Sequence, residues 1–115
     1  MRFALIALLA ATVAGCGSSF PPPNDEYSAA QADVGRAESG GAPGVPDAKL
    51  HLQLSQEDLQ KSKALIDSGD NRRAADLISV ARVEAQLALS LAKQQQAEDQ
   101  ARKAQAELAK AKGGQ

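Results

Sequence analysis

The stretch Asn71–Lys112, NRRAADLISVARVEAQLALSLAKQQQAEDQARKAQAELAKAK, runs for 42 residues without a proline or a glycine. Those two residues most often interrupt helices, so the stretch predicts one continuous helix. At 1.5 Å per residue, this helix would be about 63 Å long. It would contain more than a third of the chain, and the rest of the fold has to be arranged around it.

The two halves of this long helix differ in their apolar pattern. The first half has apolar residues on two faces: Ala74, Leu77, Ile78, Ala81, Ala85, Ala88 and Ala92 on one, and Val80, Val83, Leu87 and Leu91 on the other. After Gln94–Gln96 a single narrow stripe remains, with members alternately four and three residues apart: Ala97, Ala101, Ala104, Leu108 and Ala111. This is coiled-coil spacing, but alanine buries little apolar area. We expect this tail to be a solvated helix or to pair with a partner helix.

A second helix is predicted from about Asp47, as its cap, to about Ser68. Its apolar stripe contains Ala48, Leu52, Ser55, Leu59, Ser62 and Ile66, and Leu50, Leu54 and Leu65 widen it. Gly69 stands where a helix commonly ends in a left-handed residue, and Asp70 or Asn71 can cap the next helix. We therefore expect the wide-faced half of the long helix to pack against residues 47–68 as an antiparallel hairpin.

A short first helix is predicted over Asp25–Ser39, with Asn24 or Asp25 as its cap. Its apolar positions recur about once per turn, at Tyr27, Ala30, Val34 and Ala37. Gly35 weakens it by about 1 kcal/mol relative to alanine. The glycines and prolines of residues 40–46 end it, and we expect it to join the hairpin.

Composition supports an all-α fold. Aromatic residues are scarce, whereas Ala, Leu, Glu, Lys, Gln and Arg are abundant, as in long helices and coiled coils. The 13 basic and 14 acidic residues nearly cancel, which gives no reason to expect nucleic-acid binding. The single cysteine excludes an intramolecular disulfide.

The N-terminus has the pattern of an export signal. Arg2 precedes an apolar run of about a dozen residues, which is shorter than the roughly 20 residues of a transmembrane helix. The small residues Ala14 and Gly15 come directly before Cys16. We expect residues 1–15 to be a signal peptide and 16–24 a Pro-rich, disordered tether. Residues 25–112 would then be an alanine-rich helical domain, and 113–115 a frayed tail.

The segment Val13-Ala14-Gly15-Cys16 resembles the lipobox of bacterial lipoproteins. That resemblance implies cleavage between Gly15 and Cys16 and a thioether-linked diacylglycerol on Cys16, which would anchor the chain to a membrane. Since Gly17 is not aspartate, the resemblance implies the outer membrane, with the protein facing the periplasm. An ordinary secretory signal with an incidental cysteine is the alternative.

The helical part resembles the bacterial lipoproteins grouped as domain of unknown function 4398. The resemblance covers residues 25–112 and depends on Gly69-Asp70 at the turn, on Ala-Ala-Asp-Leu-Ile at 74–78 and on the preceding tether. It implies a tetratricopeptide-like or coiled-coil-like helical hairpin. It brings no catalytic residues with it.

No constellation in the sequence predicts catalysis, a metal site or a cofactor. His51 is the only histidine, so an ordinary zinc site cannot be built, and we expect a surface or half-buried residue there. The neighbours Glu57-Asp58 and Glu98-Asp99 point to different sides of a helix, with no pocket to shift their pKa values. Lys103, Lys110 and Lys112 can contact anionic cell-wall polymers, although a solvated face is the simpler interpretation.

These observations favour a non-enzymatic envelope lipoprotein. Its partners would be the membrane, through the lipid on Cys16, and an envelope protein or peptidoglycan bound by the helical domain. The alternative is a self-associating, alanine-rich coiled-coil spacer, in which the tail pairs in a homo-oligomer.

Overall fold

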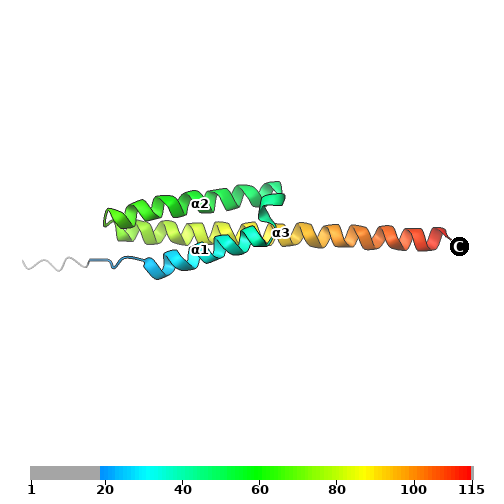
Figure 1. Cartoon of the computed structure of the whole chain (residues 1–115), viewed down its shortest axis with the longest axis horizontal. Coiled ribbons are helices and arrows are strands. Elements are labelled where there is room, and N and C mark those ends of the chain that lie inside the picture. The colour runs from blue at the N-terminus through cyan, green and yellow to red at the C-terminus, as the bar shows by residue number, and fades with distance from the viewer. Residues whose placement is uncertain (1–18, 115) are drawn as a thin grey trace, which may run out of the picture.

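The computed structural model describes residues 19–114, and within that range the chain is helical with no strand. Its elements are α1 (Asn24–Ser39), the short 3₁₀ helix η1 (Ala42–Gly44), α2 (Pro46–Asp67) and α3 (Asn71–Gly113). Figure 1 shows α2 and α3 as a hairpin, with α1 beside them and the second half of α3 projecting alone. The predicted all-α fold, with a short helix, a hairpin and one long C-terminal helix, is confirmed.

The turn between α2 and α3 forms as the sequence predicts. Gly69 has a left-handed backbone, with φ of 83°. Its N–H donates to the carbonyl of Ile66 at 3.0 Å, and the N–H of Asp70 donates to the carbonyl of Leu65 at 2.9 Å. Two such reversed bonds satisfy the last carbonyls of a helix and are typical of a glycine C-cap. The turn therefore sends α3 back along α2.

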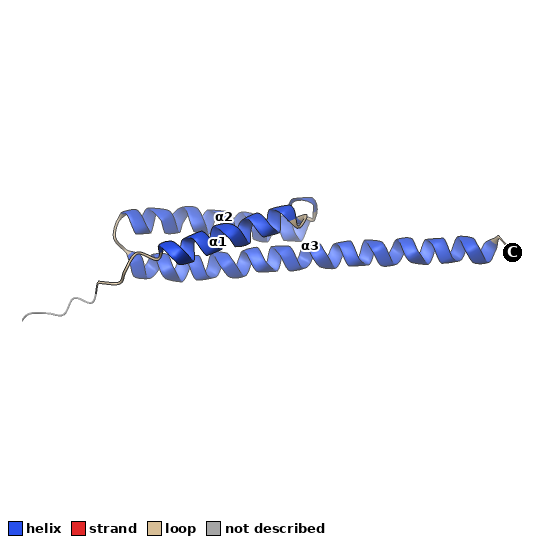
Figure 2. Cartoon of the chain, turned by 60° about the horizontal axis from the view of Figure 1, so that its bottom comes forward, coloured by secondary structure: helices blue, strands red, loops and turns tan. Residues whose placement is uncertain are grey.

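A second reversal, at the opposite end of the bundle, connects α1 to α2. Gly41 has φ of 95° and precedes η1, which delivers the chain to α2. The amide Nε2 of Gln96 on α3 donates to the carbonyl oxygen of Gly40 at 3.0 Å. α1 consequently runs parallel to α3 and antiparallel to α2 (Figure 2).

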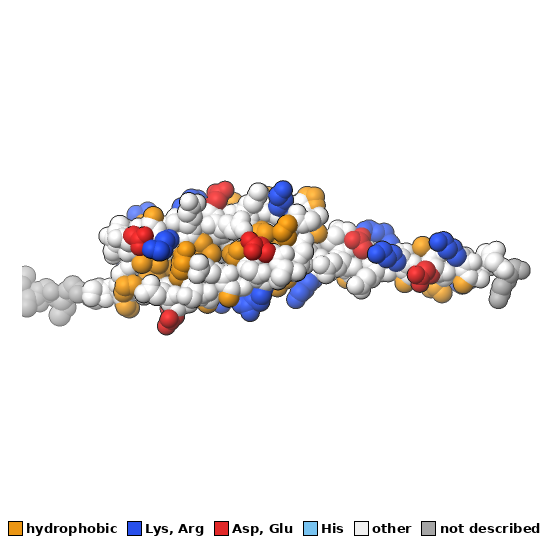
Figure 3. Space-filling model, viewed as in Figure 1, with side chains coloured by type: hydrophobic (Ala, Val, Ile, Leu, Met, Phe, Trp, Pro, Cys, Tyr) orange, Lys and Arg blue, Asp and Glu red, His pale blue; other side chains and the backbone are white. Residues whose placement is uncertain are grey.

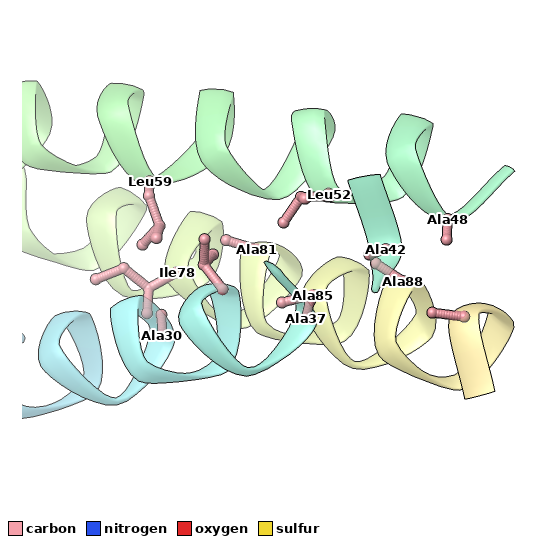
Figure 4. Close-up of a cluster of buried hydrophobic side chains, with 12 residues drawn as sticks. Ala30, Ala37, Ala42, Ala48, Leu52, Leu59, Ile78, Ala81, Ala85 and Ala88 are labelled. Carbon is pink, nitrogen blue, oxygen red and sulfur yellow. The ribbon is translucent and has the colours of Figure 1, made fainter. Parts of the chain in front are cut away.

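The core is made mainly of alanine. Twelve buried residues form it: Ala30, Val34, Ala37, Ala42, Ala48, Leu52, Leu59, Ile78, Ala81, Ala85, Ala88 and Ala92. Figure 4 shows Leu52 and Leu59 of α2 directed toward the alanines of α1 and α3. Small side chains let helix backbones approach closely, so the three helices pack tightly here without large side chains. The apolar stripes predicted for residues 25–39 and the main stripe of 47–68 are confirmed, with Tyr27 and Ile66 only partly buried.

The predicted N-caps are wrong in detail. α1 begins at Asn24 with Pro23 before it, and α2 begins at Pro46 with Val45 before it. Proline suits the first helical position because its missing N–H would have no helical partner there. Asp47 therefore lies inside α2. Asp70 precedes α3 as predicted, but its side chain makes no cap hydrogen bond.

The first half of α3 differs from expectation on its second apolar face. Val80, Val83 and Leu87 remain 48%, 62% and 40% exposed, because α1 and α2 both cover the alanine face instead. On α2, Leu50 and Leu54 are also exposed and do not widen the buried stripe. From Gln100 to Gly114 every residue is exposed, as expected for a tail that projects beyond the hairpin.

Candidate interaction surfaces

A groove lies between α1 and α2. It encloses about 430 Å³, and its lining residues are Tyr27, Gln31, Val34, Gly35 and Glu38 of α1 with Gln56, Leu59, Gln60 and Lys63 of α2. Tyr27, Val34 and Leu59 supply the apolar part, while the other long side chains are polar. On the face shown in Figure 3, hydrophobic side chains reach the surface between helices of the bundle. An apolar floor with polar groups beside it suits an amphipathic partner.

A buried carboxylate explains why α1 stands closer to α3 than to α2. Asp33 is 6% exposed, and its Oδ2 accepts a hydrogen bond of 2.8 Å from Nε of Arg82 on α3. Its Oδ1 pairs with Arg36, one turn later on α1. Burial opposes ionisation of Asp33, but the hydrogen bond and charge of Arg82, with those of Arg36, outweigh it and lower its pKa below 3.8.

The polar contact across the groove is weaker than this ion pair. Nε2 of Gln56 donates to a carboxylate oxygen of Glu38 at 2.7 Å, and both side chains are exposed. An exposed bond of this kind exchanges readily with water. The groove is therefore bridged at one point and otherwise open.

A second apolar surface lies on the opposite side of the α2–α3 hairpin. Leu65 of α2 meets Leu77 and Val80 of α3 around a shallow hollow of about 300 Å³. Farther along, Nδ1 of His51 lies 2.5 Å from a carboxylate oxygen of Glu84. These contacts join α2 to the side of α3 that carries Val80.

His51 has the position that the sequence predicts. Its side chain is 28% exposed, so it is half-buried, and its neighbour Glu84 is 24% exposed. Within residues 19–114, no group of three or more His, Cys, Asp or Glu side chains could hold a metal ion. Nor is any helix of the described range long and apolar enough to cross a membrane.

The two adjacent acidic pairs lie apart and engage their own helices. Glu57 and Asp58 both contact Lys61, at 3.8 and 3.5 Å. Asp99 pairs with Arg102, whose hydrogen bond lowers its pKa below 3.8. This shift comes from a neighbour on the same helix and not from a pocket. Lys103, Lys110 and Lys112 lie exposed on the projecting part of α3.

Sequence reasoning missed both Asp33 and the open second face of α3. Asp33 occupies the same helical rows as the core residues Ala30 and Ala37, and an acid in an apolar row signals a buried partner. The predicted lipidation and cleavage positions, Cys16 and Gly15, lie outside the described residues.

The geometry defines a small all-α protein built as a helical hairpin with an accessory helix and a projecting rod. Residues 25–104 match the family described as Domain of unknown function (DUF4398), and the chain belongs to that family. The match covers α1, η1, α2 and most of α3. Searches of curated proteins and of solved structures found no match.

Proposed function

We propose that this chain is a non-enzymatic lipoprotein of the bacterial envelope, anchored by lipid on Cys16. The observation that carries the proposal is the run of apolar residues that ends in Ala14-Gly15-Cys16. One acyl chain gives only marginal membrane binding, and a diacylglycerol on one cysteine supplies the two chains needed for stable attachment.

 We place it at the outer membrane, facing the periplasm, because Gly17 follows the cysteine.

Metabolic labelling tests the anchor directly. Cells that express the full chain are grown with a radioactive fatty acid, beside cells that express Cys16→Ala and, as a matched control, Ser18→Ala. We expect label on the unchanged chain and on Ser18→Ala, and none on Cys16→Ala, because only the cysteine sulfur can form the thioether. Label that persists on Cys16→Ala would refute lipidation at this residue.

We further propose that the anchored domain binds an envelope protein or peptidoglycan through the groove between α1 and α2. Support comes from its apolar floor of Tyr27, Val34 and Leu59, from its polar margins, and from the single exposed bridge across it. Two charged residues line the groove, and each already has a partner: Glu38 accepts the bond from Gln56, and Lys63 pairs with Asp67. They therefore suit binding contacts better than a catalytic set.

Site-specific photo-crosslinking tests the groove. A photoreactive residue replaces Gln60, which lines the groove, or Lys61, which does not line it and is exposed on another side of α2. The two positions are neighbours in one helix, so Lys61 is a matched control. We expect a discrete adduct, to protein or to glycan, from Gln60 in intact cells and none from Lys61. Equal adducts from both positions, or none from Gln60, would contradict the proposal.

A second candidate function, a self-associating spacer, is favoured by the second half of α3. All residues from Gln100 to Gly114 are exposed, and they include Leu108, which is 60% exposed. An isolated helix gains little from such a residue, whereas a paired helix would bury it.

A further inference from the structure

The exposed large hydrophobic residues of α3 all lie on one line. They are Val80, Val83, Leu87 and Leu108. Steps of alternately three and four residues join them through Ser90, Gln94, Ala97, Ala101 and Ala104, and the line ends at Ala111. All ten positions are exposed. We call this set the α3 seam.

The α3 seam has the complete heptad register of a coiled coil. Its a positions are Val80, Leu87, Gln94, Ala101 and Leu108, and its d positions are Val83, Ser90, Ala97, Ala104 and Ala111. It extends about 47 Å, along both the bundle part of α3 and the projecting tail. The tail stripe and the open second face of α3 are therefore one continuous row of exposed residues.

We propose that the α3 seam is the interface of a parallel, in-register pair formed by two copies of this chain. The proposal deepens the spacer function by naming its partner, its register and its orientation. It does not depend on lipidation of Cys16, so a failed labelling experiment would leave it untouched.

Charge complementarity identifies a second copy as the partner and a parallel orientation as the arrangement. In a parallel pair, a residue at g faces the e residue of the following heptad on the partner. Lys93 at g then faces Glu98 at e, and Glu107 at g faces Lys112 at e. Symmetry repeats each pair, so four interchain ion pairs of opposite charge form.

The antiparallel arrangement of the same seam lacks these pairs. When the whole seam overlaps, e positions face e positions and g positions face g positions. Lys93 then faces Gln100, and Glu107 faces Gln86. Glu98 and Lys112 face Leu91 and Leu77. Every one of the four charges would lose an oppositely charged neighbour, so the sequence favours the parallel pair.

The same four charged residues take no part in the ion pairs found within residues 19–114. Those pairs involve other side chains of α3, namely Arg73, Arg82, Glu84, Asp99 and Arg102. Lys93, Glu98, Glu107 and Lys112 therefore keep their charges available for a second chain. Gln94, at a central a position, would place a polar layer in the seam, which commonly fixes register.

Sedimentation of the full chain in mild detergent, over a range of protein concentrations, tests the pair. Leu108→Glu places a charge on the seam, and Ala109→Glu places the same charge one residue away, on another exposed side of the helix. Because both positions are exposed in one chain, neither change disturbs the bundle. We expect dimers of the unchanged chain and of Ala109→Glu, and monomers of Leu108→Glu. A monomer of the unchanged chain at the highest concentration would overturn the proposal.

Charge reversal tests the partner contacts. Lys93→Glu would set like charges against Glu98 of the second copy, and we expect the dimer dissociation constant to rise about tenfold. The double variant Lys93→Glu with Glu98→Lys restores opposite charges and should return it to the original range. A double variant as weak as the single one would refute the parallel pairing of these residues.

Disulfide formation tests the orientation. In a full chain carrying Cys16→Ser, Leu108→Cys places two thiols side by side in the parallel pair. In the antiparallel pair, those thiols would be about 38 Å apart. We expect a disulfide-linked dimer from Leu108→Cys and none from the off-seam control Ala109→Cys. Failure of Leu108→Cys to crosslink in a sedimenting dimer would overturn the parallel orientation.

Discussion

The hydroxyl of Ser55 on α2 donates a hydrogen bond of 2.6 Å to the backbone carbonyl of Ala81 on α3. Both residues are fully buried, so the bond forms inside the interface between α2 and α3. Such a bond requires close backbones, which the small side chains around it permit. It therefore reports how tightly the hairpin is packed.

Replacement of Ser55 by alanine should lower the free energy of unfolding by about 0.5–1.5 kcal/mol, the usual net value of one hydrogen bond. Ser62→Ala is the matched control, because Ser62 is equally buried but bonds to Leu59 of its own helix. Loss of the Ser62 bond should change the free energy of unfolding little, because alanine favours the helical conformation. Urea denaturation of both variants makes the comparison. Equal losses would show that the bond between helices has no special value.

The ion pair of Asp33 with Arg82 should stabilise the attachment of α1. Asp33→Asn keeps the shape of the side chain but removes its charge, and we expect a loss of about 1–2 kcal/mol. The cost stays moderate because Arg82 is 41% exposed and water can solvate the released guanidinium group. Asp99→Asn removes a similar pair on the projecting tail and should leave thermal unfolding of the bundle unchanged. A loss confined to Asp99→Asn would contradict this assignment.

The free energy of unfolding should depend on pH through Asp33. The pKa of Asp33 lies below 3.8 in the folded chain, so the unfolded chain binds the proton more readily. The stabilisation is complete well above pH 3.8 and is lost as the pH falls through the lower folded value. Denaturation between pH 6 and pH 2 should show this loss, and Asp33→Asn should flatten it. The same acid sensitivity in Asp33→Asn would assign the effect to other carboxylates.

The main helices and their buried faces could be predicted because their signals are local. Gly69 marked the turn, and regular spacing marked the rows that contain Leu52, Leu59 and Ile78. The exposure of Val80 and Leu87 could not be predicted in the same way. Periodicity identifies apolar faces but does not say which of two faces the neighbours will cover. Here, alanine permits the closest approach, so α1 and α2 cover the alanine face.

The candidate surfaces were less predictable than the fold, for a related reason. The groove around Val34 and Leu59 exists because Asp33 attaches α1 to α3 and leaves space beside α2. That is a long-range contact between residues 33 and 82, which no local pattern specifies. The role of Cys16, in contrast to the groove, could be predicted from a local motif. It stays a prediction that the labelling experiment tests.

Two glycines near the end of α1 should respond to alanine in opposite ways. Around Gly35 no atom lies within 4 Å of an added Cβ, so Gly35→Ala should stabilise the chain by about 0.5–1 kcal/mol through helix propensity. At Gly40 the added Cβ would clash with Leu89 and lie 2.8 Å from the carbonyl oxygen of Arg36. We expect Gly40→Ala to cost about 1–3 kcal/mol. Thermal unfolding measures both, and a stable Gly40→Ala would show that the turn adapts freely.

Hydrogen exchange should divide α3 into two parts, even though it is one continuous helix. Amides near Ala81 and Ala88 lie under fully buried side chains, whereas those from Gln100 onward belong to exposed residues. An unaccompanied helix of about 15 residues opens easily, so at monomeric dilution the tail should exchange at least about a hundredfold faster. Mass spectrometry of deuterated peptides makes the measurement, with the bundle half of α3 as internal control. Raising the protein concentration should then slow exchange in the tail, because pairing along the α3 seam protects amides that are open in the monomer. Exchange in the bundle half should stay unchanged, because its amides are already protected. A tail that exchanges slowly at every dilution would show that it is stable without a partner.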